Sequence, residues 1–508
     1  MNVSKKYVYL LLISLAAHIT ASASTFITNE DHRPSSKQAI STLSHADSQA
    51  LAVGYLYTST NSAKGNRILK LTRYIDGTLG EEKSFSTKGL GAADPDRDGP
   101  AHGDFDSNNA IKIIDNYLLV VNAGDDSISV FRLNRETGDL AFLEKVDSGG
   151  KRPVSIAYSK RYYKVDTPSH NNKLISSDRV WVLIANQESN PNLQGTDRNN
   201  LKYFPNYEYF RQYLSEADDS DLQRNISEFT LNLKTGALVK SMTTPLMTFD
   251  RENGGPTSIV GADNDFLVTT AGIPHLFTHT PLAGQIFQHP SRFYAFILDP
   301  VTGKIRAKDY WQKEGVAGLS SPMWLSATNV YYFLSSNHVN ELPSYDLITV
   351  MNTSLTNTIL QETRHISIDE TDQAGTFYNR AVSGFFQNRM RAYVSSFDDN
   401  SIASFAVDFF GGKVTRLNHV LHAEGYAPKG DSKDLYVTRT HHGDRLQDDT
   451  FVYSLGAFRS FSLSGYKATE EGLAYIGQYT YKQTQDSVGQ AGKYNFMGLT
   501  GFDFDEPQ

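Results

Sequence analysis

A repeated phrase constrains the fold of this 508-residue chain more than any other feature of its sequence. The phrase joins a β-rich segment of the type S-I-x-x-F-x-L to a turn that usually carries D-G, T-G or G-G, and then to an aliphatic residue. Apolar and polar residues alternate around the turn, which is typical of a β-hairpin. Seven copies occur, at residues 66–79, 126–140, 225–238, 291–305, 344–360, 400–414 and 458–473.

The spacing of the copies indicates how many strands each repeat contains. Successive copies begin 53 to 99 residues apart, and a second apolar strand precedes most of them. Four short strands with their loops fit this spacing, and radial repetition of four-stranded sheets gives a β-propeller. The sequence therefore predicts an all-β, seven-bladed propeller of four-stranded antiparallel blades. We expect an N-terminal strand near residues 50–58 to close the ring.

The longest gap between copies contains an insertion at about residues 159–224, rich in Asn, Asp and Tyr. It is expected to form long loops on one face, with a short helix around residues 209–218. The hairpin turns at Gly138, Gly236 and Gly303 are expected to require a positive φ, which glycine adopts at low cost.

The amino-terminal segment has the pattern of a secretory signal. Two lysines precede an apolar run at residues 7–17, and an A-x-A cleavage site follows at residues 21–23. We therefore predict a signal peptide over residues 1–23, a flexible lead-in over 24–48, and a propeller over 49–508. The expected protein is secreted, monomeric and without a transmembrane anchor.

Composition and missing motifs exclude several classes of protein. The chain has no cysteine and a formal charge of −8, so thiol catalysis and a nucleic-acid partner are excluded. No G-x-S-x-G, H-E-x-x-H or P-loop motif occurs, which disfavours serine α/β-hydrolases, zincins and P-loop enzymes. Triplets of the type N-x-S/T make Asn225 and Asn352 candidate glycosylation sites.

Several phrases resemble the lactonase-type seven-bladed propeller family, which includes 6-phosphogluconolactonases and fungal 3-carboxymuconate lactonising enzymes. The resemblance covers roughly half of the predicted mature chain, at residues 60–79, 122–133, 148–157, 325–350 and 381–407. These phrases mainly describe blades, so the resemblance implies the fold more strongly than the activity.

Active members of this family use a cluster of His, acidic and Arg side chains on the loop face near the central channel. The resemblance implies that His102 moves the proton, and that Arg152 and Arg292 hold carboxylate groups of the substrate. The acidic partner has no clear match, and Glu188 and Asp398 are both candidates.

Three asparagines end strands at equivalent places in the repeats and are candidates to line the channel and bind the substrate. The alternative is that their side chains cap turns by hydrogen bonding to the backbone. They are Asn122, Asn186 and Asn337.

An acidic loop precedes the second copy and has the opening of a calcium loop. Asp94, Asp96 and Asp98 alternate before Gly99, and such carboxylates converge on Ca²⁺ in EF-hand loops. The twelfth position is Phe105 instead of a bidentate Glu, so a solvated acidic loop is the alternative to a Ca²⁺ site.

Two functions from different classes follow from these features. The first is a secreted lactonase-like enzyme that hydrolyses a lactone or cyclises a muconate-like dicarboxylate. The second is a non-catalytic secreted propeller whose loop face binds a protein or a glycan, as in an adhesin, antigen or effector. Convergence of His102 with two arginines at one channel mouth would favour the enzyme.

Overall fold

The computed structural model describes most of the predicted propeller. Every described residue lies in one compact unit, Ile40–Gln508. The predicted signal peptide and lead-in lie outside the described residues, as does the expected helix at 209–218. The structure describes residues 51–93, 108–167, 170–188, 223–250, 254–262, 264–270, 291–312, 316–325, 330–337, 344–352, 360–367, 378–387, 389–396, 401–407, 414–421, 431–438, 441–442, 445–446, 451–488 and 494–504.

Within these residues, six antiparallel sheets have four strands each, named from the first strand outward. The first contains β31 (Met497–Asp503), β1 (Ala52–Ser59), β2 (Arg67–Tyr74) and β3 (Leu79–Ser86). The second contains β4 (Ile111–Ile114), β5 (Tyr117–Asn122), β6 (Ser127–Leu133) and β7 (Leu140–Asp147). The third contains β13 (Pro256–Ala262), β14 (Asp265–Thr270), β15 (Arg292–Leu298) and β16 (Ile305–Gln312). The other three are β17 (Val316–Leu325), β18 (Val330–Asn337), β19 (Ser344–Asn352) and β20 (Leu360–Ser367); β21 (Tyr378–Phe386), β22 (Arg389–Ser396), β23 (Ser401–Val407) and β24 (Val414–Leu421); and β25 (Ser432–Val437), β28 (Phe451–Gly456), β29 (Ser462–Thr469) and β30 (Gly472–Thr480).

A further sheet has five strands. It contains β8 (Pro153–Thr167), β9 (His170–Asn186), β10 (Asn225–Asn232) and β11 (Leu238–Lys240), and β12 (Met247–Thr248) also pairs with β10. The remaining elements are the two-stranded sheet of β26 (His441–His442) and β27 (Arg445–Leu446) and the 3₁₀ helix η6 (Lys482–Ser487).

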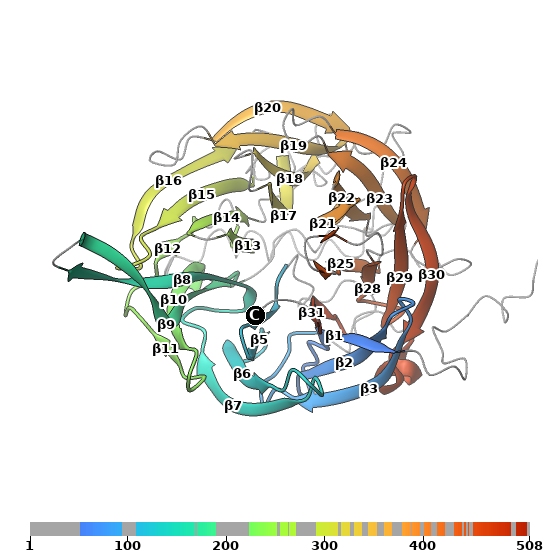
Figure 1. Cartoon of the computed structure of the whole chain (residues 1–508), viewed down its shortest axis with the longest axis horizontal. Helices are drawn as coiled ribbons and strands as arrows, with labels where there is room; N and C mark the ends of the chain where they lie inside the picture. Colours follow the sequence, from blue (N-terminus) through green and yellow to red (C-terminus); the bar gives the residue numbers. More distant parts are fainter. Residues whose placement is uncertain are drawn as a thin grey trace, which may run out of the picture. The chain divides into compact units, whose positions relative to one another are not determined.

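The sheets are arranged as the blades of a propeller. Their first strands contact one another in a closed cycle, in the order β4, β8, β13, β17, β21, β25, β31 and again β4. Figure 1 shows the sheets side by side around this cycle. Among the described residues, no helix is long and apolar enough to span a membrane.

The prediction of seven four-stranded blades is met only in part. In the described chain six blades have four strands, and the sheet of β8 has five. The extra strand forms because β10 is longer than β11, so its first residues, Asn225 and Ile226, extend past β11 and pair with β12. Each repeated phrase forms the hairpin of a third and a fourth strand, as predicted, and the apolar strands before the phrases are second strands.

The closing strand differs from the prediction. The segment near 50–58 is indeed a strand, β1, but it is the second strand of its sheet. The first strand is β31, from the C-terminal part of the chain, and it pairs with β1 from Gly54↔Asp503 to Ser59↔Met497. The C-terminal strand therefore completes the first blade, and the strand near 50–58 that was expected to close the ring takes part in the closure only as its partner.

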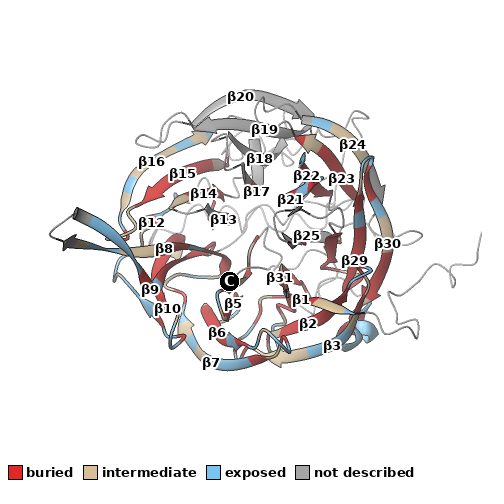
Figure 2. Cartoon of the chain, in the orientation of Figure 1, coloured by how far each residue is buried: buried red, intermediate tan, exposed pale blue. Residues whose placement is uncertain are grey.

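Burial follows the position of a strand in its blade. The second and third strands β5 and β6 are almost entirely buried, whereas the outermost strands β7 and β16 alternate between partly buried and exposed side chains. Figure 2 shows this change from buried to exposed across the blades. Alternation of this kind is expected when one face of a strand meets water.

The prediction of polar loops from residue 159 is wrong up to residue 179, whereas the apolar strand expected from Val180 is the last part of β9. Strands β8 and β9 form one long hairpin, paired from Pro153↔Asn186 to Thr167↔His170. A two-stranded ribbon with both faces in water needs no continuous apolar run, so its sequence resembles a loop. Residues 189–222 of the insertion lie outside the described part.

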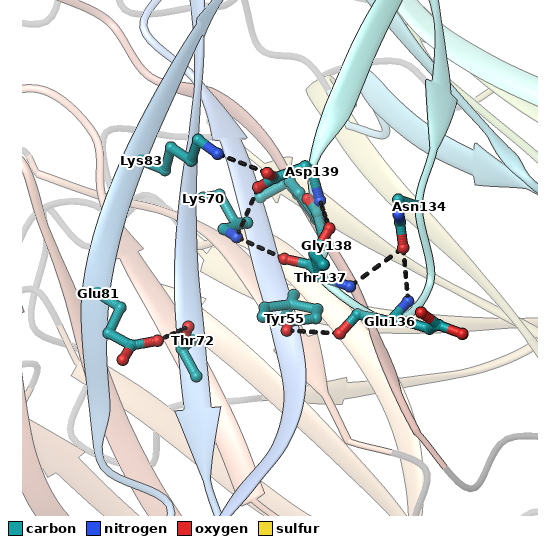
Figure 3. Close-up of polar contacts among 11 residues, drawn as sticks. Tyr55, Lys70, Thr72, Glu81, Lys83, Asn134, Glu136, Thr137, Gly138 and Asp139 are labelled. Carbon is teal, nitrogen blue, oxygen red and sulfur yellow. Dashed lines mark hydrogen bonds and ion pairs between the residues drawn. The ribbon is translucent and has the colours of Figure 1, made fainter.

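Where the structure describes the turn between a third and a fourth strand, that turn packs against the neighbouring blade, as the Gly138 turn illustrates. Tyr57 donates its hydroxyl hydrogen bond to Gly138 O at 2.8 Å, and Lys70 Nζ donates to Thr137 O at 2.7 Å. Gly138 has φ +66°, and a Cβ there would lie 2.6 Å from the Tyr55 ring. Figure 3 shows Tyr55 and Lys70 directed at this turn.

The same contact recurs at four other hairpin turns. In each, a glycine with positive φ lies against a side chain of the adjacent blade, so the expected positive φ values at Gly138, Gly236 and Gly303 are confirmed. The four further pairs are Gly77 with Phe451, Gly236 with Tyr117, Gly303 with Glu228, and Gly472 with Asn418.

We expect Gly138→Val to lower the free energy of unfolding by about 1–3 kcal/mol, because φ is positive and the Tyr55 ring occupies the space for a side chain. Urea unfolding measures this loss. The control is Gly65→Val, where φ is +140° but no atom lies within 4 Å of the new Cβ. Equal losses in the two variants would show that the ring contact contributes nothing.

We expect Asp503→Ala to cost about 3–5 kcal/mol, because it leaves the fully buried Arg73 without its carboxylate partner. Thermal or urea unfolding tests this. The matched control is Lys145→Ala, which breaks the exposed pair with Asp125 and should cost at most about 1 kcal/mol. A loss for Asp503→Ala no larger than the control would contradict the importance of ring closure.

Candidate functional site

Three short segments meet at one edge of the β8 sheet. Backbone hydrogen bonds join them, from Gln187 N to Arg152 O at 3.0 Å and from Glu188 N to Lys151 O at 2.8 Å. A third runs from Lys151 N to Gln223 O at 3.1 Å. This edge carries the connections into first strands and from second to third strands, which emerge on one face of a propeller. The segments are residues 148–152, 186–188 and 223–225.

Two residues of this edge have an uncommon backbone. Arg152 has φ +52° and Glu188 has φ +65°, values that non-glycine residues seldom adopt. Asp126 Oδ1 accepts a hydrogen bond from Arg152 N at 2.7 Å and so fixes the first of these turns. Backbone strain of this kind concentrates at functional sites, where the surrounding structure maintains it.

Glu188 and Arg224 form an ion pair at the same edge. Arg224 Nη1 lies 2.8 Å from Glu188 Oε2, and Arg224 Nε donates to Phe249 O at 3.3 Å. The Arg224 side chain is fully buried, whereas 17% of the Glu188 side chain is exposed. A buried guanidinium therefore orients a carboxylate that still reaches solvent.

Arg292 lies in the next sheet, at the start of β15. Its Nη1 is 2.7 Å from Asp250 Oδ2, its Nε donates to Gln312 Oε1 at 2.8 Å, and its guanidinium lies over the Tyr310 ring. Burial lowers the pKa of Arg292, but hydrogen bonds with Tyr294 and Asp250 outweigh burial and raise it. Asp250 follows Phe249, so one short connection links the surroundings of Arg292 to those of Arg224.

The described asparagine side chains at the strand ends form hydrogen bonds within and between the blades. Asn122 and Asn186 are fully buried. Asn122 Nδ2 donates to the hydroxyls of Ser127 and Ser129, and Asn186 Nδ2 donates to Asn225 Oδ1 at 2.9 Å. These contacts favour the capping interpretation over substrate binding. Asn337 ends β18 at the equivalent place, but its side chain is outside the described part.

Several predicted site residues are not among those that the structure describes. They are His102, Asp398 and the calcium-loop residues Asp94, Asp96 and Asp98. The described residues contain no cluster of three metal-ligating side chains.

Of the candidate glycosylation sites, Asn352 ends β19, with its side chain outside the described part. Asn225 is fully buried, and its Nδ2 donates to Gly149 O at 3.0 Å. The folded blade therefore leaves no room for a glycan on Asn225, and this candidate is wrong.

Sequence reasoning missed Arg224 and Gln187. Arg224 directly precedes the third repeated phrase, and an arginine before an Asn of a phrase is a weak signal. Gln187 is fully buried, and within the described structure neither atom of its side-chain amide has a hydrogen-bond partner. Gln187 directly precedes Glu188, but only the tertiary contact between the ends of β9 and β10 brings Arg224 beside Glu188.

Glu228 is the carboxyl group with the largest described pKa shift, and it lies away from this edge. Burial raises the pKa of Glu228 to about 8, against the opposing effects of Arg161 and of a hydrogen bond with Ser241. Its carboxylate lies under the Gly303 turn, and Glu228 is in the middle of β10, three residues after Asn225. It therefore belongs to the contact between two blades.

No family model and no curated protein matches the chain. Solved structures of lactonase-like propellers resemble it at low sequence identity. A putative 6-phosphogluconolactonase from Bacteroides fragilis is 12% identical, with 90% of this chain and 99% of that chain covered at a TM-score of 0.46. A second, from Bacteroides uniformis, is 14% identical, with coverage of 88% and 100% and a TM-score of 0.45.

The periplasmic gluconolactonase of Pseudomonas aeruginosa is also similar. It is 12% identical, with 88% of this chain and 99% of that chain covered at a TM-score of 0.49. At such identities and TM-scores these likenesses leave the substrate of this chain open.

The raised pKa of Glu228 predicts a pH-dependent stability. Between pH 4.5 and 8 the folded state holds a proton on Glu228 that the unfolded state has released, so the free energy of unfolding falls as pH rises. In the wild type the free energy of unfolding should fall by a few kcal/mol across this window, and we expect this fall to be absent in Glu228→Gln. Urea unfolding across this window measures it, with the exposed Glu136→Gln as control. Parallel pH profiles for wild type and Glu228→Gln would contradict the prediction.

Proposed function

We propose that this chain is a lactonase-type propeller enzyme whose site is the edge that carries Arg152, Glu188 and Arg224. The observation that supports it best is the Glu188–Arg224 pair, in which a buried guanidinium orients a partly exposed carboxylate. Arg152, on a backbone turn hydrogen-bonded to that of Glu188, adds a second guanidinium at the same edge. One carboxylate and two guanidinium groups suit a lactone that carries an acidic group.

In this proposal Glu188 acts as the general base. It takes a proton from water, the hydroxide oxygen bonds to the lactone carbonyl carbon, and the ring C–O bond then breaks. The ring oxygen takes the proton back from Glu188, so one water is added in total. Arg152 binds the acidic group of the substrate, while Arg224 keeps the Glu188 carboxylate in place.

Export and the second function remain proposals of the same kind. The signal-like segment at residues 1–23 supports export, which N-terminal sequencing of the processed protein tests. Non-catalytic binding of a protein or glycan is favoured by the length and polarity of the segment 189–222, which follows Glu188 in the sequence.

We expect the purified protein to open at least one lactone of a panel of sugar lactones and muconolactones. Titration in a pH-stat measures the acid that each ring opening releases. Glu188→Gln should lower kcat by about 10²–10⁴-fold, because the general base is lost, and Arg152→Ala should mainly raise KM. The control is Glu136→Gln, an exposed carboxylate in a hairpin turn.

Unchanged turnover in Glu188→Gln would show that the edge is not the catalytic site. If the wild-type protein opens no lactone of the panel, the enzyme proposal fails and the binding function takes its place.

A further inference from the structure

The end of the β8–β9 hairpin extends beyond its sheet. β10 pairs with β9 only as far as Asn232↔Arg179, and beyond this point β8 and β9 pair only with each other. Figure 1 shows this part of the hairpin projecting away from the neighbouring sheets. We call residues 160–165 and 173–179 the ribbon arm.

The base of the ribbon arm is fixed to the next blade. Tyr162 N and Trp181 Nε1 both donate to Pro300 O, each at 3.0 Å. The Arg161 guanidinium lies over the Trp181 ring, 4.4 Å from its centre. These contacts hold the arm in one direction and leave its far part in solvent.

The ribbon arm exposes large apolar side chains on both of its faces. The exposed fractions of Tyr163, Leu174 and Ile175 are 46%, 48% and 44%. Tyr163 is paired with Ile175, and Leu174 is paired with Lys164 on the other face. A two-stranded ribbon has no core in which to bury such residues, so a cluster of them indicates a surface that meets another apolar phase.

The ribbon arm is basic, although the chain has a formal charge of −8. It contains five basic residues and one acidic residue, Asp178, which is paired with Lys234 at 2.6 Å. Like charges on two copies of the arm would repel each other, and lysine on a strand edge opposes edge-to-edge pairing. The charge therefore favours an anionic partner over the arm of a second copy.

We propose that the ribbon arm binds a membrane surface that displays anionic lipid head groups. Tyr163, Leu174 and Ile175 enter the boundary between head groups and acyl chains, and the ammonium groups of Lys164 and Lys173 reach the lipid phosphates. Aromatic and aliphatic side chains among lysines combine the two forces that hold peripheral proteins on such surfaces.

The test is co-sedimentation with phosphatidylcholine vesicles that do or do not contain phosphatidylserine. We expect binding only with phosphatidylserine, and release at about 1 M salt, where the Debye length is about 3 Å. Lys164→Glu/Lys173→Glu should weaken binding at least about tenfold, because two lysine contacts with the anionic surface are lost. Leu174→Ser/Ile175→Ser should weaken it as well.

The matched control is Lys64→Glu/Ile75→Ser, an exposed lysine and an exposed isoleucine outside the arm, which should bind as wild type does. Thermal unfolding verifies that the arm variants remain folded. The proposal is overturned if no vesicle is bound, or if the arm variants bind as tightly as the control. It is also overturned if light scattering shows instead a dimer that the arm variants abolish.

Discussion

The joining of the two ends of the chain in one sheet is the constraint on which the propeller depends. β31 pairs with β1 and contacts the first strands β4 and β25 on either side, so it completes the cycle of first strands. The buried ion pair of Arg73 with Asp503 ties β2 to the same strand. A ring of blades has no free edge only when this sheet is complete. Loss of the pairing between β31 and β1 would expose two blade faces at once.

Contacts between neighbouring blades hold each blade in place around the ring. The glycine turns pack on aromatic or polar side chains of the adjacent blade, and these contacts lie at the opposite ends of the strands from Arg152 and Glu188. The edge that carries the candidate site is thus supported by rigid strands, which can maintain the positive φ of Arg152 and Glu188. The proposed chemistry depends on this support, because a carboxylate and two guanidinium groups must keep their mutual geometry.

Part of the candidate site was predictable from single residues. Arg152 follows a Ser-Gly-Gly turn that resembles the lactonase family, and Glu188 directly follows the strand-ending Asn186 and Gln187. Arg224 was not predictable, because it is separated from Glu188 by a connection whose course the sequence leaves undefined. The burial of Asn122 and Asn186 was not predictable, because an exposed turn and a buried one have the same local sequence.

The sequence by itself determined the hairpins, the glycine turns with positive φ and the radial repetition, because each depends on local alternation and on residue types within one repeat. The tertiary structure decided which end of the chain supplies the closing strand, where a fifth strand joins a blade, and that residues 159–179 form a ribbon. These features depend on pairing between distant segments. Strand pairing uses backbone N–H and C=O groups that every residue except proline has, so side-chain patterns cannot encode it alone.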